Sequence, residues 1–246
     1  MEKTSWITRF TYVSLVASIS LFSTSCTGQI KDIFNKAKQT VLPSEDGDVG
    51  LGLKEALKFG VNEAVEKLSA DKGYLESPYK ILIPEEAQTV VSKVKMIPGF
   101  ENVEKDLIEK MNKAAELAAK KATPIFVDAI TSLTIQDAMN ILLGEQDAAT
   151  RYLETNTRNP LYDAFLPVIQ SALDEVNARE YWKTVVNAYN GIPFVKKVNP
   201  ALDDHVNNKA LDGLFSLIEV KEAKIRTDQS QRTTDLLRKV FARQDK

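Results

Sequence analysis

Apolar residues recur at helical spacing along almost all of the chain after Gly50, and this period limits the fold more than any other feature. In LGLKEALKFGVNEAVEKLS, residues 51–69, apolar side chains fall three or four positions apart, and the same spacing returns from Phe100 to Lys121. Such spacing places the apolar side chains on one face of an α-helix. Only YKILIPEEA, residues 79–87, contains a short apolar run that resembles a strand. We therefore predict an all-α fold.

Residues that commonly cap a helix N-terminus precede several of these periods: Thr123, Thr134, Asp147, Asp203 or Asp204, and Asp228. Thr134 and Asp137 have the spacing of a capping box, in which each residue satisfies the backbone N–H of the other. Pro124, directly after Thr123, is expected to be the first residue of a helix, whereas Pro167 is expected to break or kink one. These signals predict a series of helices joined by short turns.

The composition excludes several kinds of site. The 246 residues are 43% hydrophobic, which is enough for a sizeable core, and the formal net charge is −2, which gives no sign of a nucleic-acid-binding surface. The chain has one cysteine, Cys26, and one histidine, His205. A disulfide framework or a cysteine-based metal site within one chain is therefore excluded.

The N-terminus has the pattern of an export signal. Lys3 and Arg9 precede a largely apolar run at residues 10–22, which is too short to span a membrane comfortably, and small residues then lead to Cys26. A cysteine at this place resembles the lipobox of bacterial lipoproteins, in which it becomes the acylated N-terminus, although Ser23 stands where leucine is usual. The alternative is a plain cleaved signal with an incidental Cys26.

We accordingly divide the chain into a signal peptide at residues 1–25, a lipidated tether at 26–49 and a helical domain at 50–246. The tether contains the basic amphipathic segment IKDIFNKAKQTVL, residues 30–42, which is expected either to dock on the domain as a short helix or to lie on the membrane surface. The segment PSEDGDVG, residues 43–50, has the composition of a loop. The expected location is the cell envelope, anchored by lipid to the outer membrane and facing the periplasm.

From Gly50 onward the chain resembles the bacterial family known as domain of unknown function 4197. The resemblance rests on seven collinear segments: GLKEAL (52–57), MNKAAELA (111–118), IFVDAI (125–130), LTIQDA (133–138), LLGEQDAATRYL (142–153), KALDGLF (209–215) and RTTDLLRKVF (232–241). The resemblance implies a helical protein that Gram-negative bacteria export or anchor by lipid. It implies no activity and no catalytic residue.

Five polar residues stand beside apolar helix faces and form a candidate polar pocket: Asn112, Glu116, Asp128, Asp137 and Arg151. Buried charges are usually paired, so Glu116, Asp128 and Arg151 are expected to form a structural salt-bridge network between helices. The alternative is a pocket for a ligand or a metal. For Asp137, the simpler expectation is the capping box with Thr134.

Hydrolase and nucleotide motifs do not occur in the sequence. A Ser-His-Asp triad would need His205, but there is no G-x-S-x-G elbow, and no G-K-[ST] follows a glycine-rich loop. The segment DDHVNN around His205 offers no second histidine, so we expect neither a metal site nor a cofactor.

The leading expectation for function is a non-catalytic binding or structural component of the envelope. It would meet the membrane through its lipid anchor and an envelope protein or small ligand through the domain, with no nucleic-acid partner. One alternative is a carrier of small molecules or lipids with a pocket between helices. The other is a hydrolase that uses Glu116 and Asp128 as its two carboxylates.

Overall fold

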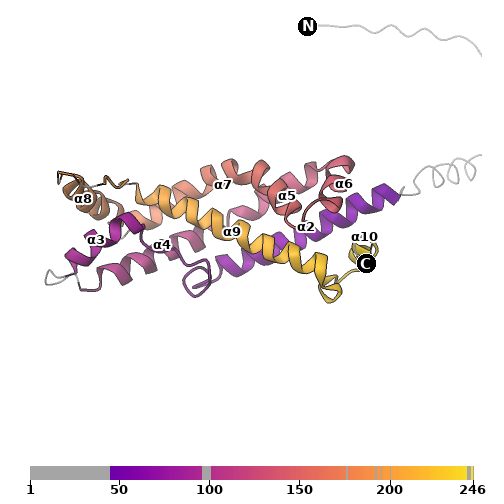
Figure 1. Ribbon diagram of the computed structural model, residues 1–246, viewed down its shortest axis with the longest axis horizontal. Coiled ribbons are helices and arrows are strands. Elements are labelled where there is room, and N and C mark those ends of the chain that lie inside the picture. The colour runs from indigo at the N-terminus through magenta and orange to yellow at the C-terminus, as the bar shows by residue number, and fades with distance from the viewer. Residues whose placement is uncertain are drawn as a thin grey trace, which may run out of the picture. The chain divides into compact units, whose positions relative to one another are not determined.

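The computed structural model describes residues 45–95, 101–175, 177–191, 193–194, 196–199, 201–242 and 245. Within these residues every regular element is a helix, which confirms the all-α fold (Figure 1). The elements are α2 (Glu45–Ser69), α3 (Glu85–Val94), α4 (Val103–Ala119), α5 (Ala122–Ser132), α6 (Ile135–Leu143), α7 (Ala148–Asp174), α8 (Ala178–Asn190), α9 (Leu202–Thr227), the 3-10 turn η1 (Gln229–Gln231) and α10 (Asp235–Phe241). The expected signal peptide, Cys26 and most of the tether lie outside the described residues.

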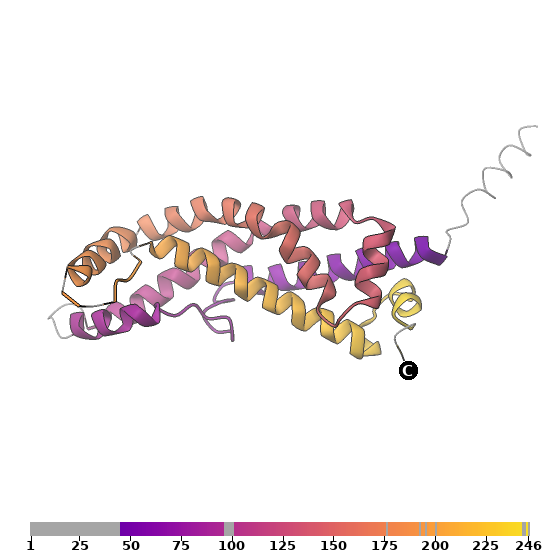
Figure 2. The ribbon, with the colours of Figure 1, turned by 45° about the horizontal axis from the view of Figure 1, so that its top comes forward.

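Long helices pack side by side in the domain. α7 packs along both α9 and α4, while α2 contacts α4, α5, α6, α9 and α10. Figures 1 and 2 show α6 and α10 beside the N-terminal half of α2, and α3 and α8 at the opposite end of the bundle. A single apolar core runs through these helices.

The alanine face of α4 lies at the centre of this packing. Ala114, Ala115, Ala118 and Ala119 are completely buried, as is Met111. Small side chains let the backbones of neighbouring helices approach closely, and α4 contacts α2, α7 and α9. These alanines therefore allow α4 to pack closely against three neighbouring helices.

The strand-like run at residues 79–87 does not form a strand. Residues 80–84 are irregular, and Ile81 and Ile83 are buried in the core. The side-chain amide of Asn112 accepts a hydrogen bond from Ile81 N at 2.9 Å and donates one to Ile81 O at 2.9 Å. One asparagine thus supplies the two hydrogen bonds that a neighbouring strand would supply.

The helical domain begins earlier than composition suggested. α2 starts at Glu45, so residues 45–50 of the predicted loop form a helix instead. Val49 is part of the core. Gly52, in the second turn of α2, serves close packing, because a Cβ on it would lie 2.5 Å from Val240 Cγ2 of α10.

The caps agree with prediction in part. Thr134 and Asp137 form the predicted capping box at the start of α6. Asp147 occupies the N-cap position of α7, but its side chain makes no capping hydrogen bond. α5 begins at Ala122 rather than at Pro124, so Thr123 is not its cap. Pro124 instead lies in the first turn, where a proline removes no helical hydrogen bond.

Other predicted helix boundaries also differ from those in the structure. α7 continues as one helix through both Pro160 and Pro167, which lie on its exposed side, so of the predicted break or kink at Pro167 the break does not occur. Asp228 caps the 3-10 turn through Ser230 N, whereas Thr234 caps α10 through Leu237 N. α9 begins at Leu202, which places Asp203 in its first turn instead of at the cap.

No single helix among the described residues has both the length and the apolar composition of a membrane span. α5 and α6, which are bent by 102° at their junction, meet that requirement only as a pair and only by length and composition.

Two glycines of α2 give a matched test of this packing. Gly60→Ala should stabilise the protein by about 0.5–1 kcal/mol, because alanine favours a helix. The added Cβ would lie 3.7 Å from Lys221 Cβ, which is an ordinary contact. Gly52→Ala gains the same propensity but must displace Val240, and overpacking costs about 1–3 kcal/mol. Urea unfolding should therefore show a higher midpoint for Gly60→Ala and a lower one for Gly52→Ala; equal midpoints would contradict the close approach of α10 to α2.

Candidate functional site

The structure does not bring the five predicted pocket residues together. Asn112 and Glu116 are buried on α4, whereas Asp128 is exposed on α5. Asp137 serves the capping box of α6. Arg151 lies on α7 with a side chain that is 74% exposed, and its guanidinium pairs with Asp147 at 2.6 Å. The salt-bridge network predicted for Glu116, Asp128 and Arg151 is therefore not formed.

Asn112 and Glu116 make polar contacts with nearby parts of the domain. Asn112 holds Ile81, as described above, and also donates to Ile108 O at 2.7 Å. Glu116 is buried on one side by the core, and its Oε2 lies 3.5 Å from Lys113 Nζ. Lys113 in turn pairs with Asp71 at 2.6 Å. The ion pair with Lys113 offsets part of the cost of burying this carboxylate, although Glu116 Oε2 accepts no hydrogen bond within the described residues.

A buried ion pair on α9 forms the most connected polar group in the described part of the chain. Glu222 accepts hydrogen bonds from Ala149 N at 2.9 Å, and from Thr150 N and Thr150 Oγ1 at 2.8 Å each. Both N–H groups belong to the first turn of α7. Glu222 therefore caps α7 from another helix, in place of the neighbouring Asp147.

Arg226 completes this pair at the end of α6. Its Nε and Nη2 donate to Glu222 Oε1 at 2.9 and 2.8 Å. The same guanidinium donates to Ile141 O at 2.8 Å and to Leu142 O at 3.2 Å. These carbonyls end α6, so a cation there also matches the negative end of the helix dipole.

Arg232 repeats the arrangement at the end of α9. It donates from Nε to Ile225 O at 3.0 Å and from Nη2 to Arg226 O at 2.9 Å. It also forms two hydrogen bonds to Asp245, at 2.7 and 2.8 Å, and these hold the pKa of Asp245 below its ordinary value. The Arg232 guanidinium carbon lies 5.8 Å from the centre of the Phe241 ring.

Our sequence reasoning did not identify Glu222, Arg226 or Arg232. One signal was present: Glu222 falls in the helical register of Ile218 and Ile225, which is the buried stripe of α9. A carboxylate within an apolar stripe, four residues before an arginine, indicates a buried pair rather than a solvated one.

The main open feature of this region is a surface groove between α7 and α9, with a volume of about 200 Å³. Its lining consists of Asp147, Thr150, Arg151, Glu154, Asp212, Phe215, Ser216 and Glu219. Four of these side chains are carboxylates and one is a guanidinium. We call this feature the acidic groove.

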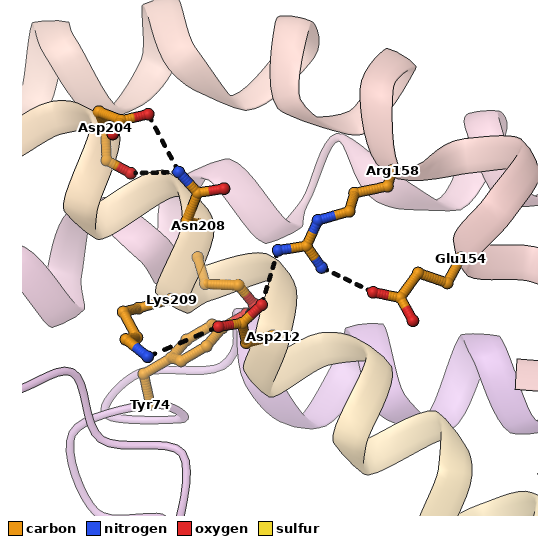
Figure 3. A network of polar contacts seen from close by, with 8 residues as sticks. Tyr74, Glu154, Arg158, Asp204, Asn208, Lys209 and Asp212 are labelled. Atoms are coloured by element: carbon orange, nitrogen blue, oxygen red, sulfur yellow. Dashed lines mark hydrogen bonds and ion pairs between the residues drawn. The ribbon is translucent and has the colours of Figure 1, made fainter. Parts of the chain in front are cut away.

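An ion-pair ladder continues the acidic groove along the same two helices (Figure 3). Arg158 of α7 donates to Glu154 at 2.8 Å and to Asp212 of α9 at 2.6 Å. Lys209 lies 3.6 Å from Asp212. One turn away, Asn208 donates to the backbone and side-chain oxygens of Asp204 at 3.0 Å each. These contacts position carboxylates from both helices along one line.

Arginines pair with three of the four carboxylates of the acidic groove: Arg151 with Asp147, and Arg158 with Glu154 and Asp212. The hydrogen bond from Arg151 holds the pKa of Asp147 below its ordinary value. Further along the same helices, the hydrogen bond to Asp204, together with burial, raises the pKa of Tyr162 to about 12. Asp147 therefore has the low pKa of a paired carboxylate, whereas a general acid needs a raised one.

The described residues contain no group of three or more histidine, cysteine or carboxylate side chains that could hold a metal ion. His205 Nε2 instead lies 2.9 Å from Leu82 O. An apolar pocket beside Glu222 and Arg226 has a volume of only about 20 Å³, roughly room for one water molecule.

Comparison with known proteins identifies a family. The model of the family described as "Protein of unknown function (DUF4197)" matches residues 44–242. Neither the curated proteins nor the solved structures contain a match to the chain.

Two arginines test which polar group matters for stability. Arg226→Met should leave Glu222 without its cation and two carbonyls of α6 without donors, and breaking a buried pair costs roughly 3–5 kcal/mol. Arg151→Met removes an exposed ion pair and should leave the midpoint of urea unfolding almost unchanged. The opposite order of the two midpoints would mean that Arg226 is not the structural cation.

Proposed function

The chain belongs to the DUF4197 family of proteins of unknown function, and we propose that it is a lipid-anchored, non-catalytic binding component of the cell envelope. The observation that carries the binding role is the acidic groove, where carboxylates from two long helices line one surface hollow. A partner with basic groups fits this chemistry, and a basic segment of an envelope protein is the partner that we propose.

The side chains of the acidic groove are suited to binding because they are already positioned. Ion pairs restrain Asp147, Glu154 and Asp212, so a cationic partner would order few additional side chains. Glu219 is exposed on α9 and adds a further charge at the rim. Such a surface attracts cations at a distance, and this attraction falls as salt rises.

The proposed location rests on the N-terminal pattern. A basic start, a short apolar run and small residues precede the lone Cys26. Acylation of this cysteine would hold the protein stably on a bilayer, since several acyl chains together anchor far better than one. The helical domain would then act at the membrane surface.

The two alternative functions receive less support. A carrier of apolar cargo needs an apolar pocket that encloses it. The pocket beside Glu222 has room for about one water molecule, and the larger hollow beside α4, of about 650 Å³, is open and lined mainly by charged side chains. A hydrolase based on Glu116 and Asp128 needs both carboxylates at one site. Glu116 is buried on α4, and Asp128 is exposed on α5.

The anchor can be tested in the native host. Cys26→Ser should release the protein from the membrane fraction or leave it as an unprocessed precursor, because serine cannot take the thioether-linked lipid. Mass spectrometry of the mature parent protein should find an acylated Cys26 at its N-terminus. An unmodified mature protein that is cleaved elsewhere would disprove the anchor.

The acidic groove can be tested with a fluorescent oligolysine peptide and the purified full chain. Binding should weaken as salt rises, and Glu219→Gln should lower the association constant about two- to fivefold, which is typical of one exposed charge pair. Glu66→Gln, an exposed site on α2, is the matched control and should bind like the parent. Equal losses in both variants would indicate attraction to net charge rather than to the acidic groove.

A further inference from the structure

α6 is apolar on two sides. Ala138, Ile141 and Leu142 face the core and are buried. Ile135, Met139 and Leu143 follow one another at four-residue steps, which places them along one side of the helix. Ile135 and Leu143 are 54% and 73% exposed, and Met139 is half-buried. We call Ile135, Met139 and Leu143 the α6 apolar face. Exposed apolar side chains that lie together can form a surface that a membrane or another molecule covers.

The α6 apolar face lies near the point where the chain enters the domain. A Cβ on Gly50 would lie 3.9 Å from Ile135 Cγ1, so Ile135 approaches the second turn of α2. Leu51, the next residue of α2, is itself 58% exposed. Figures 1 and 2 show α6 beside the N-terminal half of α2, whereas α8 lies at the opposite end.

The length of the preceding chain keeps this end close to the anchor. Cys26 precedes Glu45 by 19 residues, a stretch that spans at most roughly 65 Å when fully extended. The end of the domain that carries α6 is therefore presented to the bilayer at a high effective concentration.

We propose that the α6 apolar face rests on the lipid surface to which Cys26 is anchored, with Ile135 and Leu143 inserted among the lipid headgroups and upper acyl chains. This inference rests on the proposed lipid anchor. It adds an orientation, in which the α6 end of the bundle meets the bilayer and the α8 end points away. Insertion removes exposed apolar surface from water, which is how amphipathic helices bind at membrane interfaces.

A fluorescent reporter can test this orientation in the full, lipidated chain. Acylation occupies the Cys26 thiol, so Leu143→Cys would provide the only free thiol for an environment-sensitive dye. Ile135→Cys gives a second reporter on the same face. Phe194→Cys is the control, because Phe194 is fully exposed and follows α8 at the other end of the bundle. All three proteins are reconstituted into vesicles of phosphatidylethanolamine and phosphatidylglycerol.

The dye at Leu143→Cys and Ile135→Cys should shift its emission to the blue on reconstitution and lose fluorescence when the phospholipids are brominated. The dye at Phe194→Cys should do neither. Unchanged emission at residues 135 and 143, in protein that still floats with the vesicles, would refute the orientation and leave the anchor standing. A blue shift that ignores bromination and grows with protein density would show that a second copy covers the face. Protein that fails to float would refute the anchor and the orientation together.

Discussion

The ion pair between Glu222 and Arg226 satisfies two helix ends that meet inside the protein. α6 ends and α7 begins within five residues, so the carbonyl end of one helix and the N–H end of the next are buried close together. Buried backbone groups of this kind need hydrogen-bond partners. Glu222 supplies the acceptor for α7 and Arg226 supplies the donor for α6. Because both side chains come from adjacent turns of α9, three helices are held in one register.

This register determines where the surface features lie. α9 and α7 can place Asp212 and Glu154 on opposite sides of Arg158 only while the two helices keep the same longitudinal alignment. Arg232 carries the alignment onward, since it binds the last carbonyls of α9 and joins them to Asp245 beyond α10. α10 in turn packs where Gly52 leaves space on α2. Charged side chains suit this task because hydrogen bonds specify direction, which apolar contacts do not.

The local part of this structure was accessible from sequence, and the long-range part was not. The helical period and the pair Thr134–Asp137 depend on residues within one or two turns, and both predictions are confirmed. The cap of α7 depends on a residue more than seventy positions away, so Asp147 was a reasonable local choice and Glu222 was out of reach. Arg151 and Arg226 both follow a carboxylate by four residues. The pair of Arg151 is solvated and the pair of Arg226 is buried, and this difference depends on which helix packs against each pair.

Contacts at both ends of α6 keep its outward apolar face exposed. A short helix with apolar residues on both sides could in principle rotate to bury more of them. α6 has no such freedom, because the capping box fixes its first turn and Arg226 holds its last carbonyls. Ile135 and Leu143 therefore remain directed away from the core even though water is an unfavourable environment for them. Because α6 is held at both ends, only a surface outside the domain can cover these two side chains, and the surface that we propose is the bilayer to which Cys26 would be anchored.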